Sequence, residues 1–150
     1  MIEIRTTSPD ETLALGRLLA THLATGDVIL LSGRLGCGKT VLAAGIAEGL
    51  GVEQPIVSPS FVIVRSYLDG FLPLFHADVY RLGSMAEFDD LELVDAARQG
   101  VLLIEWGEAV GAGVPEDHLL VRMVADEDER RLIRFYPAGS WEQRQLELVV

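Results

Sequence analysis

The sequence predicts an α/β fold with a mainly parallel central sheet, helices on both faces and added antiparallel strands. Two short, continuous apolar runs, 28–31 and 101–104, are bounded by turn residues, as is typical of strands buried on both faces. Helical patterns alternate with these runs along the chain, which favours a layered α/β arrangement. With 150 residues and no internal repeat or long linker, we expect 1–150 to form a single domain.

The first helix is predicted from its capping residues. Ser8 can cap its N-terminus, Pro9 suits the first helical position, and Glu11 completes a capping box. We expect Gly26 to end this helix. The apolar residues that follow at helical spacing are Leu15, Leu18, Leu19 and Leu23.

Two more helices are predicted from similar signals. One is expected to start near Lys39 and to stop within 49–51, because apolar residues recur on one face between these points. The other opens with a second capping box, formed by Ser84 and Glu87, and ends at Gly100. A short helix is also possible from Trp141 onward.

Two hairpins are expected to add the antiparallel strands. Asp69 and Gly70 stand between two β-rich segments, which is a good hairpin signal. An acidic turn separates the second pair of segments. The pairs are 61–67 with 71–75, and 119–125 with 131–136.

A glycine-rich segment after the first apolar run matches the phosphate-binding pattern G-x-x-x-x-G-K-[ST], which predicts a P-loop NTPase fold. A tight loop entering a helix N-terminus aims several backbone N–H groups at one anion, and Gly36 and Gly38 keep side chains out of the approach. Lys39 would reach the β- and γ-phosphates, and Thr40 would face Mg²⁺. The nucleotide contacts expected here are Gly33, Leu35, Gly36, Cys37, Gly38, Lys39, Thr40 and Val41.

A chance match to this pattern is improbable, because Lys39 is the only lysine in a chain with 11 arginines. Arginine could not easily replace it, since the guanidinium group is larger and differently shaped. Cys37, the single cysteine, excludes an intrachain disulfide. Its place at a helix N-terminus would tend to lower the thiol pKa. We favour a small residue that fills the loop over a redox switch.

A P-loop also needs an acidic residue opposite the metal, usually at the end of a buried strand. Glu105 follows the run 101–104 directly, and Asp78 follows the predicted strand near His76. One could hold Mg²⁺ while the other positions the attacking water, and the residues alone leave the assignment open. The catalytic candidates are therefore Lys39, Asp78 and Glu105, whereas His76 is more often structural. Ser60 could sense the γ-phosphate, as switch loops do.

Four motifs occur in an order that resembles the TsaE (YjeE) family of bacterial ATPases of tRNA threonylcarbamoyladenosine synthesis. The resemblance covers about residues 8–135. The motifs are Gly-Asp-Val-Ile-Leu-Leu-Ser-Gly-Arg-Leu-Gly-Cys-Gly-Lys-Thr, Ser-Pro-Ser-Phe, His-Ala-Asp-Val-Tyr-Arg-Leu and Ile-Glu-Trp. The resemblance implies a mixed-sheet P-loop domain that binds and hydrolyses ATP with Mg²⁺ in support of the TsaD–TsaB pair. That pair transfers threonylcarbamoyl to the adenosine beside the anticodon in tRNAs that read codons starting with A.

The resemblance also implies roles for single residues. Thr40 and Glu105 would hold the metal, and Asp78 would be the second essential acid. Ser60 stands where the family usually has Thr. Trp106 matches a tryptophan linked to activity or partner contact, and Arg130 loosely matches a basic residue near the nucleotide. The departures from the usual family residues are Arg34 for Asp, Cys37 for Ala and Gly107 for Pro.

Composition limits the other functions. A net charge of −11 disfavours direct nucleic-acid binding, so tRNA is expected to be reached through protein partners. The absence of Asn and of a second Lys excludes the guanine-specific Asn-Lys-x-Asp element of GTPases. The N-terminus lacks a signal-peptide pattern and no run is long enough to span a membrane, so we expect a cytoplasmic protein. A small-molecule kinase and a nucleotide-gated module without hydrolysis remain alternatives.

Overall fold

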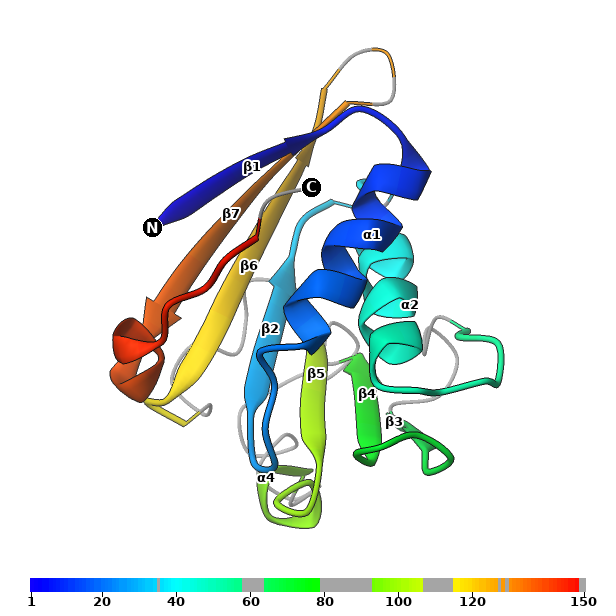
Figure 1. Cartoon of the computed structure of the whole chain (residues 1–150), viewed down its shortest axis with the longest axis vertical. Coiled ribbons are helices and arrows are strands. Elements are labelled where there is room, and N and C mark those ends of the chain that lie inside the picture. The colour runs from blue at the N-terminus through cyan, green and yellow to red at the C-terminus, as the bar shows by residue number, and fades with distance from the viewer. Residues whose placement is uncertain are drawn as a thin grey trace.

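A mixed sheet runs through the molecule (Figure 1). The computed structural model describes residues 1–34, 36–57, 64–78, 93–106, 115–126, 128 and 130–148. Within them, seven strands follow the order β1-β7-β6-β2-β5-β4-β3. Strands β6, β2, β5 and β4 pair in parallel, and β1, β7 and β3 add antiparallel pairs, which confirms the predicted sheet. The strands are β1 (Ile2–Thr6), β2 (Val28–Ser32), β3 (Val64–Tyr67), β4 (Leu74–Asp78), β5 (Val101–Trp106), β6 (His118–Ala125) and β7 (Arg131–Ala138).

Helices cover both faces of the sheet. Helices α1 (Pro9–Ala20) and α2 (Lys39–Gly49) lie side by side over one face, where they share the larger apolar core with alternate residues of the strands (Figure 1). On the opposite face, the short helix α4 (Leu93–Ala96) packs through Val94 against a smaller apolar cluster. Successive residues of β2 enter the two cores in turn, which confirms that this strand is buried on both sides. None of the described helices is long and apolar enough to cross a bilayer.

Small residues let α1 and α2 approach each other closely. A Cβ atom on Gly16 would lie 2.6 Å from the Leu42 carbonyl oxygen, and one on Gly45 would collide with the Leu13 carbonyl. Gly49 likewise lies against Ala20. Because most of these contacts are with backbone atoms, a neighbouring side chain cannot simply turn away to relieve them. Helix α2, and with it the glycine-rich loop at its start, is therefore held firmly against α1.

The first helix is shorter than the sequence predicts. Its start is as expected, since the Glu11 backbone N–H donates to Ser8 Oγ at 3.2 Å. It ends at Ala20 rather than at Gly26, however, and a turn follows. Gly26 has a φ of 91° in that turn and donates its N–H to the Gly100 carbonyl at 2.7 Å. The glycine therefore shapes the entry into β2 and does not end the helix.

Strand β4 lies further along the chain than the predicted segment 71–75. Phe71 belongs to the turn before it and donates its backbone N–H to the Leu50 carbonyl. Its side chain is 85% exposed, so its β-forming character does not place it in the sheet. As a consequence, Asp78 is the last residue of the strand instead of lying beyond its end.

Strand β1 was not predicted from the sequence at all. Its pattern alternates apolar Ile2 and Ile4 with charged Glu3 and Arg5, which is the period of a strand with one buried face. It pairs antiparallel with β7, and the Arg134 guanidinium donates to Glu3 Oε2 at 3.0 Å across this pair. The expected second hairpin is confirmed as β6 and β7.

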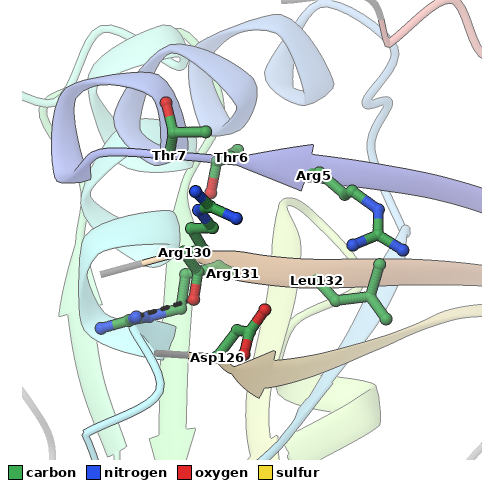
Figure 2. Close-up of a pocket in the computed structure, with 7 residues that line it drawn as sticks. All are labelled: Arg5, Thr6, Thr7, Asp126, Arg130, Arg131 and Leu132. Carbon is green, nitrogen blue, oxygen red and sulfur yellow. Dashed lines mark hydrogen bonds between the residues drawn. The ribbon is translucent and has the colours of Figure 1, made fainter. Parts of the chain in front are cut away.

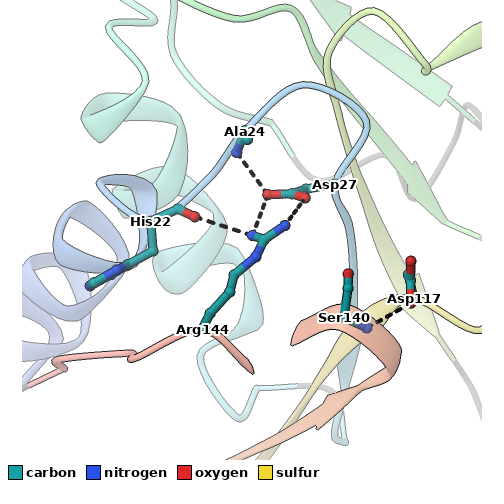
Figure 3. A network of polar contacts seen from close by, with 6 residues as sticks. All are labelled: His22, Ala24, Asp27, Asp117, Ser140 and Arg144. Carbon is teal, nitrogen blue, oxygen red and sulfur yellow. Dashed lines mark hydrogen bonds and ion pairs between the residues drawn. The ribbon is translucent and has the colours of Figure 1, made fainter. Parts of the chain in front are cut away.

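The C-terminal segment folds back onto the loop between α1 and β2 (Figure 3). The predicted short helix at Trp141 is a 3₁₀ helix, η2 (Gly139–Gln143). Beyond it, Arg144 donates to both carboxylate oxygens of the buried Asp27 and to the His22 carbonyl. Of the helix predicted from Ser84 to Gly100, residues 84–92 lie outside the described residues, and its described part ends at Ala96 because turns follow over 97–100.

Candidate active site

The glycine-rich loop joins β2 to α2 with unusual backbone angles. Gly33, Gly36 and Gly38 have φ values of 154°, 81° and 99°, a region that side-chain-bearing residues rarely adopt. Gly38 caps α2 without a side chain, and the first turn of the helix carries no acidic residue. The first backbone N–H groups and the positive end of the helix dipole are therefore offered to an anion.

The side chain of Lys39 folds back over this loop. Its Nζ donates to the Gly33 carbonyl oxygen at 2.7 Å, so the ammonium group lies where the loop leaves β2. A phosphate oxygen arriving here would offer the ammonium group a charged acceptor in place of a neutral one. Thr40 is exposed on the first turn of α2, so its hydroxyl is accessible to a ligand.

Cys37 fills the interior of the loop. Its side chain is 3% exposed, and a Cβ atom on Gly33 would come within 2.6 Å of its Sγ. Burial raises the pKa of the thiol, and the nearby Lys39 opposes this effect only in part. The pKa lowering expected at a helix N-terminus is therefore wrong for this cysteine. The finding agrees with a small residue that packs the loop.

The two candidate carboxylates lie on neighbouring strands. Asp78 and Glu105 are register partners of the parallel pair β4 and β5, and Glu105 is also opposite Leu31 of β2. Leu31 stands two residues before Gly33, where the loop begins. Carboxyl ends of parallel strands are where α/β sheets bind ligands. The register therefore places both carboxylates at the end of the strands from which the loop emerges.

Glu105 is buried, with 6% of its surface exposed, and has a histidine beside it. His76 Nε2 lies 3.3 Å from Glu105 Oε2, and the histidine is fully buried. Successive side chains of a strand alternate between its two faces, so His76 shares the face of Asp78. Neighbouring residues in the larger core show that this is the face covered by α1 and α2.

The donor set is suited to magnesium rather than to a metal held by protein alone. Among the described residues, no group of three or more His, Cys, Asp or Glu side chains could hold a metal ion. Magnesium typically takes one or two carboxylates and completes its shell with water and substrate phosphates. Thr40 and Glu105 fit this pattern, because they would supply a hydroxyl and a carboxylate beside the glycine-rich loop.

A second basic group lies over the loop. Arg131, the first residue of β7, donates from Nη2 to the Gly36 carbonyl at 3.4 Å and from Nη1 to the Arg130 carbonyl at 3.0 Å. The resemblance implies that the preceding residue, Arg130, lies near the nucleotide, and that role stays a prediction. Figure 2 shows the Arg130 guanidinium directed toward Thr6 and Thr7, away from that of Arg131. The Arg-Arg pair was visible in the sequence, but only the start of β7 decides which arginine reaches the loop.

Arg130 and Arg131 also line a cavity of about 180 Å³ beside the loop (Figure 2). It lies where the end of β1 meets the start of β7, at one end of the sheet. Three arginines, two threonines, one aspartate and one leucine line it. The lining residues are Arg5, Thr6, Thr7, Asp126, Arg130, Arg131 and Leu132.

Some predicted site residues cannot be placed. Leu35, Ser60 and the side chain of Trp106 lie outside the described residues, although the Trp106 backbone pairs with Ser32 at the end of β5. Val41 is half-buried on the first turn of α2, and Arg34 is exposed on the outside of the loop.

The chain was compared with known proteins. Residues 6–133 match the family model described as threonylcarbamoyl adenosine biosynthesis protein TsaE. A Bacillus subtilis protein named tRNA threonylcarbamoyladenosine biosynthesis protein TsaE is 41% identical over 137 residues, which cover 91% of this chain and 85% of the relative. A protein of the same name from Streptomyces coelicolor is 46% identical over 112 residues, covering 73% and 76%. The crystal structure of Bacillus subtilis YdiB superposes with a TM-score of 0.78 at 35% identity, covering 95% of this chain and 89% of YdiB.

Proposed function

Since the chain belongs to the TsaE family of tRNA threonylcarbamoyladenosine biosynthesis proteins, we propose that it binds ATP with Mg²⁺ and hydrolyses it in support of a TsaD–TsaB pair. The observation that carries this proposal is the register of the sheet. It sets Glu105 beside the strand that enters the phosphate loop, with Asp78 one strand further away. A loop without a nearby carboxylate would suit binding alone, whereas this pairing suits hydrolysis.

The residues divide the work as follows. Lys39 would exchange the Gly33 carbonyl for oxygens of the β- and γ-phosphates, and the first N–H groups of α2 would hold the phosphate chain. Thr40 and Glu105 would hold Mg²⁺, which neutralises the charge that develops on the phosphates. Asp78 would orient the attacking water. We assign the metal to Glu105 because it stands directly opposite β2, and Asp78 does not.

We place the nucleoside in the cavity lined by Arg130 and Arg131. Arg131 lines this cavity and also contacts the loop at Gly36, so a nucleotide on the loop has the cavity as its neighbour. Guanidinium groups can pair with phosphate or lie flat against a base. The Thr7 hydroxyl, which already donates to Glu11, would accept a hydrogen bond from the sugar or the base, whereas the Thr6 hydroxyl is buried against Thr12.

The pair served by the ATPase would modify the adenosine beside the anticodon in tRNAs that read codons starting with A. The net charge of −11 supports an indirect route to tRNA, because an acidic surface repels the phosphate backbone. Protein partners would then carry the nucleic-acid contacts. Work on tRNA would place the protein in the cytoplasm.

The test is ATP hydrolysis by the purified chain, alone and with a TsaD–TsaB pair. We expect slow turnover alone, a rise with the pair, and loss of turnover in Glu105→Ala. Glu116→Ala is the matched control, because Glu116 is an exposed acid before β6, at the other end of the sheet. If ATP binds but Glu105→Ala turns over like the wild type, a nucleotide-gated binding module becomes the better description. If the pair has no effect, phosphate transfer to small molecules should be examined.

A further inference from the structure

His76 is a buried polar group without an evident purpose in the fold. It lies in the middle of β4 and none of its surface is exposed. Among the described residues, neither ring nitrogen has a hydrogen-bond partner. Buried polar side chains are nearly always hydrogen-bonded in folded proteins, so an exception calls for an explanation. A histidine kept only for packing would be expected to satisfy at least one nitrogen.

The Glu105 carboxylate lies beside the ring. The distance of 3.3 Å between His76 Nε2 and Glu105 Oε2 is short enough for a hydrogen bond, but the two groups are not aligned to form one. Leu74 and Leu103, which are buried on the same face, offer carbon atoms only. Catalytic hydrogen bonds are often long without ligand and tighten in the loaded complex.

We propose that His76 is a positioning residue that holds the Glu105 carboxylate toward Mg²⁺ by donating a hydrogen bond from Nε2. This inference rests on the proposed function, in which Glu105 is the metal-linked acid. One carboxylate oxygen engaged by the ring would fix the rotation of the group and leave the other oxygen for the metal. Ligating carboxylates are commonly held in this way, and the loss of such a partner typically costs 10–100-fold in metal affinity or activity, as an order of magnitude.

The register of the sheet explains why this position suits the task. His76 of β4 pairs with Leu103 of β5, two residues before Glu105. The ring therefore reaches the carboxylate diagonally on the neighbouring strand. Asp78 pairs with Glu105 directly and stands two residues after His76 on the same face. The histidine therefore lies deeper in the sheet than either acid, next to the candidate site rather than in it.

The test compares His76→Gln with His76→Asn. A glutamine amide nitrogen can stand near the position of Nε2, whereas an asparagine nitrogen stands near that of Nδ1. The readout is the Mg²⁺ concentration that gives half of the metal-dependent change in binding of a fluorescent ATP analogue, together with the affinity for that analogue in EDTA. We expect His76→Asn to need about 10–100-fold more Mg²⁺ and His76→Gln to stay within a few-fold of wild type. The affinity for the fluorescent ATP analogue in EDTA should be the same in both variants as in the wild type.

Two controls separate this role from a structural one. Leu74→Ala removes a buried side chain from the same face of β4, and should lower thermal stability without changing the Mg²⁺ requirement. Glu105→Gln should raise that requirement in its own right. If Glu105→Gln has no effect, both the proposed function and this inference fail. If Glu105→Gln acts but His76→Gln and His76→Asn behave alike, only the inference fails.

A measurement on the unaltered protein covers the case in which a variant does not fold. The chain has three histidines, so ¹⁵N labelling of histidine gives a simple ring-nitrogen spectrum. Addition of Mg²⁺ with a non-hydrolysable ATP analogue should produce a protected Nε2–H signal from His76, shifted as expected for a carboxylate acceptor. The signal should be absent in Glu105→Ala, which removes the acceptor. A ring that is unchanged by Mg²⁺ and nucleotide would overturn the inference.

Discussion

Arg144 donates two hydrogen bonds to the two carboxylate oxygens of Asp27, from Nη1 at 2.8 Å and from Nη2 at 2.6 Å. Asp27 is 6% exposed, and its Oδ2 also accepts the backbone N–H of Ala24 at 2.7 Å. The guanidinium group lies 3.8 Å from the ring centroid of Trp141, which is itself buried. One arginine thus joins the end of the chain to the turn that enters β2.

Loss of this arginine should destabilise the protein. Arg144→Ala leaves the buried Asp27 carboxylate short of its charged partner, and we expect a loss of about 2–3 kcal/mol in the free energy of unfolding. Thermal unfolding should occur about 5–10 °C lower. The control is Arg98→Ala, whose ion pair with Asp95 is largely exposed and should contribute less than about 1 kcal/mol. Equal melting temperatures for the two variants would contradict the proposed importance of this pair.

The contact between α1 and α2 should not tolerate a methyl group. Alanine normally stabilises a helix interior by about 1 kcal/mol relative to glycine. At Gly45, however, the added Cβ would strike the Leu13 carbonyl, so we expect Gly45→Ala to lower the free energy of unfolding by about 1–3 kcal/mol. Chemical denaturation measures the difference. Glu48→Ala, on the exposed side of the same helix, should stay within about 0.5 kcal/mol of wild type. A more stable Gly45→Ala would mean that the helices can move apart.

Arg131 should contribute to nucleotide affinity. Its removal would leave phosphate or base without a charged donor over the loop, and hydrogen bonds to charged groups are worth about 1.5–3 kcal/mol. We therefore expect Arg131→Ala to weaken ATP binding by about 10–100-fold in titration calorimetry. Arg134→Ala is the control, since Arg134 lies on the same strand but pairs with Glu3. If only Arg130→Ala weakens binding, the nucleotide contact belongs to Arg130 and not to Arg131.

Cys37 should make stability depend on pH in the alkaline range. Burial raises the thiol pKa above its ordinary value of 9.0, so the folded state holds the proton more tightly than the unfolded state. The stabilisation is therefore complete below pH 9 and is lost as the pH rises through the folded pKa. Chemical denaturation of wild type and of Cys37→Ala between neutral and alkaline pH measures this pH-dependent part of the free energy of unfolding, because the variant has no thiol to titrate. Identical pH profiles would show that the thiol is accessible to water.

Much of the fold was predictable because its signals are local. The runs that form β2 and β5 are continuous and apolar, and the loop pattern fixes the start of α2 to the residue. The start of α1 follows from Ser8 and Pro9 in the same way. In each case, backbone or side-chain groups close together in the sequence determine the structure.

The errors arise where distant contacts decide. Phe71 resembles a strand residue, but its N–H is taken by Leu50 and the strand begins three residues later. Gly26 resembles a helix terminus, but its partner is Gly100. At the site, the contact of Arg131 with the loop depends on where β7 begins, and the approach of His76 to Glu105 depends on the register of two strands, so neither could be predicted from the sequence.

The pairing of β1 with β7 has a consequence for how the protein is made. Strand β1 leaves the ribosome long before its neighbour β7, because Ile2 pairs with Phe135. Until β7 follows, β1 and the cavity beside it lack one wall, and Arg131 is absent from the loop. A nascent chain can thus form the core around α1, α2 and β2 early, yet it completes the candidate site only after β7 has been made.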